Sequence, residues 1–116
     1  KKIFFEGMAG ETYCIGGEAE KTNLEVAFSI CETLDQLIPI GFSYKNLIEF
    51  VEDRPGHDKR YAIDSAFIRK ELGWKPNFNF KESLNLTVEW YLKNKDWINN
   101  IQSKVSYKGE RLGLKK

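Results

Sequence analysis

The 116-residue sequence has no long hydrophobic run, only two cysteines and a single histidine. Without a run of about 20 apolar residues it contains no predicted membrane span, and no signal peptide is visible at its start. Cys14 and Cys31 are too few for the disulfide framework of a small secreted domain, and Cys31 is interpreted as a buried free thiol. These absences predict a protein of the reducing cytoplasm that has no contact with a membrane.

The sequence also lacks the patterns of most reaction centres. Because His57 is the only histidine, no Cys/His set has metal-site spacing and no nucleophile triad can be assembled. No Gly-x-Gly-x-x-Gly loop follows a predicted strand, so the usual dinucleotide-binding turn is missing. Tyr91 and Lys95 have the Tyr-x-x-x-Lys spacing of short-chain dehydrogenases, but Tyr91 falls on an apolar helical stripe and is interpreted as a core residue. We therefore predict no catalytic residue, no cofactor bound to this chain and no metal.

Charge and length set the remaining limits. A net charge of +1, with acidic and basic residues interleaved, argues against nucleic acid as the main partner. The length suits one domain. We predict a domain over residues 1–102 and a polar, basic tail over 103–116. The sequence begins with Lys1 and not with Met, which suggests a fragment or a processed product.

The predicted fold class is α/β, mixed and mainly helical, with a few short strands and about three helices. Residues 12–15 are β-prone and end at a Gly-Gly turn, and residues 47–51 read as a second strand. Thr22 with Glu25 forms the capping-box pattern of a first helix, which ends before Pro39.

Two further helices are expected. Asp64 is the predicted cap of a short helix that Gly73 ends. Asn79 with Glu82 repeats the capping-box pattern and begins a long helix, which the Trp97-Ile98 stretch is expected to continue.

The segment 53–64 holds two arginines, a lysine, three aspartates and the only histidine. Pro55-Gly56 predicts a tight turn within it, since Pro55 fixes its own φ and Gly56 accepts a positive φ. Arg54 and His57 would then project from a rigid corner and donate hydrogen bonds to a diphosphate. The alternative is a surface turn joined by local ion pairs. Exposed pairs add only a few tenths of a kcal/mol, so ligand binding is favoured.

Asn23 is the third candidate binding residue. It lies in the first turn of the helix that follows the predicted Gly-Gly turn. Helix N-termini present free N–H groups to anions, and the Asn23 amide could hold a phosphate or sugar oxygen. The alternative is simple helix capping.

Five segments together resemble the C-terminal part of dTDP-glucose 4,6-dehydratases, which belong to the extended short-chain dehydrogenases. They are Glu11 to Gly17 (ETYCIGG), Lys21 to Val26 (KTNLEV), Asp53 to Asp64 (DRPGHDKRYAID), Glu71 to Pro76 (ELGWKP) and Thr87 to Tyr91 (TVEWY). The resemblance covers about Gly10 to Asn100. One departure is Cys14, where the family usually has asparagine.

The resemblance implies a small substrate-binding domain without the Rossmann domain that holds NAD in the full-length, homodimeric family. The residues that match Asn23, Arg54 and His57 line the nucleotide–diphosphate end of the substrate site in that family. The implied lyase reaction converts dTDP-glucose to dTDP-4-keto-6-deoxyglucose, a precursor of rhamnose and of lipopolysaccharide O-antigen sugars. This chain alone would bind the dTDP-sugar and be inactive, and a separate Rossmann-domain chain is a candidate partner.

Two other interpretations stay open. One is a non-enzymatic interaction fragment whose exposed apolar surface binds a partner. Candidate surface residues for that role are Phe4, Phe5, Phe42 and Phe78. The other is part of a related nucleotide-sugar epimerase or decarboxylase, against which the segment 54–64 argues.

Overall fold

The computed structural model of the chain describes residues 1–53, 55–58 and 60–104. Within these ranges the regular structure is entirely helical. The elements in chain order are α1 (Lys2–Glu6), α2 (Asn23–Leu37), the 3₁₀-helix η1 (Tyr44–Leu47), α3 (Ala66–Leu72), α4 (Phe80–Lys93) and α5 (Lys95–Lys104). The prediction of a mainly helical chain is confirmed, whereas the predicted strands are wrong for the described residues.

Both strand predictions fail because the described residues offer neither segment a strand to pair with. Residues 12–15 are irregular, and Tyr13 uses its side chain elsewhere: its ring stacks on Phe67 at 5.2 Å, and its hydroxyl accepts a hydrogen bond from the Met8 N–H. Residues 47–51 begin at the end of η1 and continue without regular structure. A β-prone segment becomes a strand only when a neighbouring strand satisfies its backbone groups, so local propensity alone misleads here.

The helix starts follow the sequence closely. At α2 the Glu25 N–H donates to the Thr22 hydroxyl, and the Thr22 N–H donates to the Glu25 carboxylate. At α4 the same reciprocal pair joins Asn79 and Glu82. Both predicted capping boxes are therefore confirmed.

Replacing the α4 cap should weaken this helix measurably. In Asn79→Ala the Glu82 N–H loses its side-chain acceptor, and we expect the free energy of unfolding to fall by about 1 kcal/mol in urea titrations. Asn99→Ala is the matched control, because Asn99 is an exposed position inside α5 where alanine favours the helix. Equal losses in the two variants would contradict a capping role for Asn79.

Two helix boundaries differ from prediction. The N-cap of α3 is Ser65 and not Asp64, although the Asp64 carboxylate still accepts from the Ala66 N–H at 2.8 Å. Gly73 ends α3 in the left-handed conformation, as predicted. The Trp97 stretch does not extend α4, because α4 ends at its C-cap Asn94. The Asn94 side-chain amide donates a hydrogen bond to the Trp90 carbonyl at 2.7 Å.

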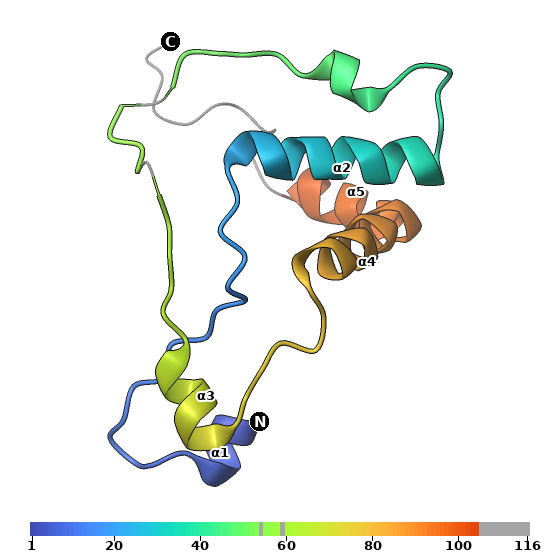
Figure 1. The fold of residues 1–116 in the computed structure, drawn as a ribbon. Coiled ribbons are helices and arrows are strands. Elements are labelled where there is room, and N and C mark those ends of the chain that lie inside the picture. The colour runs from blue at the N-terminus through green and yellow to red at the C-terminus, as the bar shows by residue number, and fades with distance from the viewer. Residues whose placement is uncertain (54, 59, 105–116) are drawn as a thin grey trace.

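The helices form two groups. In Figure 1, α1 lies beside α3 near the N-terminus, while α2 packs against α4 and η1, and α4 against α5. A hydrogen bond of 2.7 Å from the Thr33 hydroxyl to the Asn85 amide oxygen joins α2 to α4. Long irregular segments connect the two groups.

Few apolar side chains are buried. The buried apolar residues are Cys31, Ile68 and Leu72, which confirms the buried thiol predicted at Cys31. The radius of gyration is 18.4 Å, against about 13 Å for a compact domain of ~100 residues. The described chain is therefore open and leaves much apolar surface uncovered.

None of the described helices is long and apolar enough to cross a membrane. The boundary between 1–102 and the tail at 103–116 stays a prediction, because residues 105–116 lie outside the described part.

Candidate ligand-binding site

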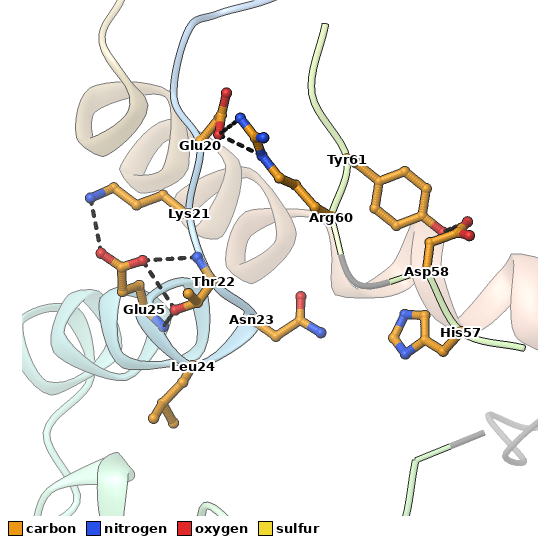
Figure 2. Close-up of a pocket in the computed structure, with 10 residues that line it drawn as sticks. All are labelled: Glu20, Lys21, Thr22, Asn23, Leu24, Glu25, His57, Asp58, Arg60 and Tyr61. Carbon is orange, nitrogen blue, oxygen red and sulfur yellow. Dashed lines mark hydrogen bonds and ion pairs between the residues drawn. The ribbon is translucent and has the colours of Figure 1, made fainter. Parts of the chain in front are cut away.

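A pocket of about 610 Å³ lies between the start of α2 and the segment that follows the Pro55-Gly56 turn. Its volume falls in the range of ~300–1,000 Å³ that is common for small-molecule sites. The residues that line it are Glu20, Lys21, Thr22, Asn23, Leu24, Glu25, His57, Asp58, Arg60 and Tyr61 (Figure 2). The pocket thus brings together two of the three predicted binding residues, Asn23 and His57, from positions far apart in the sequence.

Asn23 is the first residue of α2, and Thr22 is its N-cap. Since Thr22 does the capping, the alternative of simple capping by Asn23 is wrong. The Asn23 amide extends toward the wall that carries His57 (Figure 2) and makes no hydrogen bond to any described side chain or backbone group. An amide at a helix N-terminus can therefore donate to or accept from a ligand there.

The corner that carries His57 is a turn, as predicted. Gly56 has φ +71°, which a glycine adopts without strain. His57 Nδ1 lies 2.8 Å from the Asp53 carboxylate, and the His57 side chain is 26% exposed. Asp53 therefore fixes the ring orientation, and Nε2 is the nitrogen left to meet a ligand.

Arg54, the third predicted binding residue, lies outside the described residues, as does Lys59. Its role in binding stays a prediction. The residues on either side of it, Asp53 and Pro55, belong to the same corner as His57.

The charges of the pocket are largely paired with one another. The Arg60 guanidinium donates from Nε and Nη2 to the Glu20 carboxylate at 2.9 and 2.6 Å. Lys21 Nζ lies 3.3 Å from the Glu25 carboxylate. The Tyr61 hydroxyl donates to Asp58 at 2.8 Å. These pairs order the rim of the pocket and leave the Asn23 amide and His57 Nε2 as uncommitted polar groups.

Glu25 links the pocket to helix capping. Its pKa is held below the usual 4.5 chiefly by the hydrogen bond from the Thr22 N–H, with further bonds from the Thr22 hydroxyl and from Lys21. A depressed pKa means that the folded state holds the charged form more tightly than the unfolded chain does. The stabilisation is therefore present above about pH 4.5 and is lost as the pH falls through the folded-state pKa.

This linkage predicts an acid-sensitive helix start. In Glu25→Gln the amide oxygen still accepts from the Thr22 N–H, but the ionisable group is gone. We expect its free energy of unfolding to vary less with pH below about pH 4.5 than that of the wild type. Urea titrations at several pH values below and above 4.5 measure the two slopes. An unchanged slope in Glu25→Gln would show that Glu25 does not contribute to the acid response.

Glu20, Arg60 and Tyr61 were not predicted as site residues. Glu20 and Arg60 stand 40 residues apart, and nothing in the one-dimensional pattern indicates that they meet. Their nearness to the predicted residues was the available signal, since Glu20 precedes Asn23 by three residues and Arg60 follows His57 by three.

The Tyr-x-x-x-Lys pair falls outside this pocket. Tyr91 is 52% exposed and packs edge-on against Trp90 at 5.3 Å, so its interpretation as a core residue is wrong. Lys95 begins the next helix. Neither side chain lines the pocket, and no group of three metal-ligating side chains occurs among residues 1–53, 55–58 and 60–104.

The chain is similar in sequence to known nucleotide-sugar dehydratases. A family model described as GDP-mannose 4,6 dehydratase matches residues 5–87. A dTDP-glucose 4,6-dehydratase from Salmonella typhimurium is 56% identical over 101 residues, which are 87% of this chain and 28% of that protein. One from Neisseria meningitidis serogroup B is 50% identical over 119 residues, covering 99% and 33% of the two chains.

A solved structure is similar as well. The crystal structure of dTDP-glucose 4,6-dehydratase from Bacillus anthracis in complex with NAD matches with a TM-score of 0.68 and 42% identity. The match covers 82% of this chain and 28% of that one. The chain thus spans about a third or less of the length of these relatives.

Proposed function

Because the chain belongs to the GDP-mannose 4,6-dehydratase family, we propose that it is the dTDP-sugar-binding part of a dTDP-glucose 4,6-dehydratase. The observation that carries the proposal is the pocket in which Asn23 and His57 face one ligand space. Identities of 50–56% to dTDP-glucose 4,6-dehydratases favour this substrate over those of other nucleotide-sugar enzymes. In the whole enzyme the reaction would be the conversion of dTDP-glucose to dTDP-4-keto-6-deoxyglucose.

The chemistry of the pocket suits a nucleoside diphosphate. The N-terminus of α2 offers backbone N–H groups and the positive end of the helix dipole to a phosphate. His57 Nε2 and the Arg54 guanidinium would supply further donors, and Arg54 would add a positive charge. The Asn23 amide can bind a phosphate or sugar oxygen from the same side. Each of these groups binds and orients the substrate, and none removes a proton or a hydride.

The described residues do not fit an NAD site. They contain no strand followed by a glycine-rich turn and a helix, which is the arrangement that holds a dinucleotide. NAD belongs to the Bacillus anthracis relative, and no step of hydride transfer is derived from this chain. We propose that the chain contributes substrate binding only. The homodimer, a separate Rossmann-domain chain and a cytoplasmic location stay predictions.

Binding of dTDP to the 116-residue chain tests the proposal. His57 is the only histidine, so its ring C–H signals in an NMR spectrum are unambiguous. We expect dTDP to shift them in a saturable manner and inorganic phosphate to do so only at much higher concentration. The chain alone should give no product from dTDP-glucose and NAD. Absence of saturable dTDP binding would contradict the binding role, and product formation would contradict the restriction to binding.

The exposed apolar surface favours a second candidate function, that of an interaction fragment. Phe4 is 84% exposed and Phe5 70%, while Phe42 and Phe78 are more than half exposed. The same surface is expected if, in the whole enzyme, it is covered by the two thirds of the relatives' length that this chain does not span. Light scattering at rising concentration separates the two. A monomer with dTDP affinity supports substrate binding, whereas self-association without dTDP affinity supports the interaction fragment.

A further inference from the structure

The Glu20–Arg60 ion pair joins the two walls of the pocket. Glu20 lies in the irregular segment before α2, and Arg60 lies on the segment that follows the His57 corner. Both guanidinium bonds reach the same carboxylate oxygen, at 2.9 Å from Nε and 2.6 Å from Nη2. In the described part of the chain, no other side-chain hydrogen bond connects residues 18–25 to residues 55–61. The pair is thus the one such link across the pocket (Figure 2).

Each member of the ion pair is close in sequence to one of the two predicted binding residues. Glu20 stands three positions before Asn23 along one wall, and Arg60 stands three positions after His57 along the other. Neither wall is held by a sheet, since the segments before α2 and after the corner are irregular. The distance between Asn23 and His57 therefore depends on what joins these segments, and the ion pair is a direct hydrogen-bonded contact that does so.

We propose that Glu20 and Arg60 are positioning residues that set the separation of Asn23 and His57 for a nucleoside diphosphate. The proposal rests on the dTDP-binding role given above. In this proposal the Arg60 guanidinium stays bonded to the Glu20 carboxylate when the ligand binds, and it does not contact the phosphates. Its role differs in this way from the direct ligand contact proposed for Arg54.

The competing arrangement is that Arg60 leaves Glu20 and binds a phosphate directly. The two arrangements predict opposite signs for Glu20→Gln. If the pair positions the walls, weakening it raises the Kd for dTDP. If Arg60 is a phosphate ligand, removing the competing carboxylate lowers the Kd, because the guanidinium is released to the anion.

The test measures dTDP affinity by calorimetry in a set of variants. We expect Glu20→Gln to raise the Kd about threefold to fivefold, since exposed ion pairs couple weakly. Arg60→Glu should weaken binding further because two carboxylates then repel. The exchanged pair, Glu20→Arg with Arg60→Glu, should restore the Kd to within about twofold of wild type, because the attraction is rebuilt with the same groups. Glu32→Gln, which breaks the exposed Glu32–Lys45 pair of α2 and η1 away from the pocket, is the control and should leave the Kd unchanged.

A second measurement works without nucleotide. ¹⁵N relaxation of the His57 and Tyr61 amides reports the order of the wall that carries Arg60. We expect faster internal motion in Glu20→Gln and recovery in the exchanged pair. A wild-type chain that does not bind dTDP overturns the binding role, whatever the relaxation shows. A lower Kd in Glu20→Gln, no rescue by the exchanged pair, or unchanged relaxation overturns the positioning role.

Discussion

Arg54→Ala is expected to weaken dTDP binding by about 1.5–3 kcal/mol, which corresponds to roughly 10-fold to 150-fold in Kd. This magnitude is typical of a hydrogen bond to a charged group. Truncation to alanine removes both the hydrogen-bond donors and the positive charge of the guanidinium. Calorimetric titration of dTDP into the wild type and the variant measures it. The loss should exceed that of truncating a neutral group such as the Asn23 amide, because a guanidinium would supply a full positive charge to the diphosphate.

The described neighbours of Arg54 support this expectation. His57 lines the pocket and turns Nε2 away from Asp53, so the corner is already oriented toward a ligand. Arg60 and Lys21, the described cations of the pocket, are both paired with glutamates. A diphosphate in this pocket therefore needs another cation, and Arg54 stands three positions before His57 in the sequence.

Lys93→Ala serves as the control for Arg54→Ala. It removes one positive charge from an exposed pair with Glu89 on α4, away from the pocket. We expect its Kd to match that of the wild type, which separates a local contact from an effect of net charge. Equal Kd values for Arg54→Ala and Lys93→Ala would remove Arg54 from the site.

The local chemistry of helix ends was predictable from sequence. Thr22 with Glu25 and Asn79 with Glu82 each satisfy two backbone donors within four residues, so the signal and the structure lie in the same short segment. Gly73 is a similar case, because a left-handed residue at a helix end favours glycine wherever the chain goes next. These elements depend on no distant contact.

The strands and the core were not predictable in this way. Residues 12–15 and 47–51 have β-prone composition, but a strand exists only with a partner, and the described residues provide none. Tyr91 fails for a related reason. Its helical stripe is apolar, yet the open arrangement of the two helix groups leaves it half exposed. Periodicity predicts which face would be buried, whereas packing decides whether anything covers it.

In the candidate site too, residues with a local sequence signal were predictable and residues joined by distant contacts were not. Asn23 and His57 carried local signals, a helix start and a Pro-Gly corner, and the structure places both on one pocket. Glu20 and Arg60 carried none, because an ion pair across 40 residues depends on how the chain folds back. Residue chemistry could indicate what binds, whereas only the three-dimensional arrangement could indicate what holds the binding groups apart.

Ile68→Ala is expected to lower the free energy of unfolding by about 2–4 kcal/mol. Ile68 is 1% exposed and is one of only three buried apolar residues of the described chain. The variant removes buried apolar volume and leaves a cavity. Because the core is small, few neighbouring side chains can rearrange to fill that cavity. Urea titration followed by far-UV circular dichroism measures the loss, and the fitted midpoint should fall without a comparable change in slope.

The effect should reach the pocket through α3. Ser65, at the start of α3, donates to the Gly16 carbonyl, and Arg69 pairs with Glu18 at 2.6 Å, so α3 anchors the segment that leads to Glu20. We therefore expect weaker dTDP binding by Ile68→Ala even where most molecules remain folded. Ile101→Ala is the control, because Ile101 is 43% exposed on α5 and its truncation leaves no cavity. Equal losses of stability in the two variants would contradict the core role of Ile68. Wild-type dTDP affinity in Ile68→Ala would contradict the support of the site by α3.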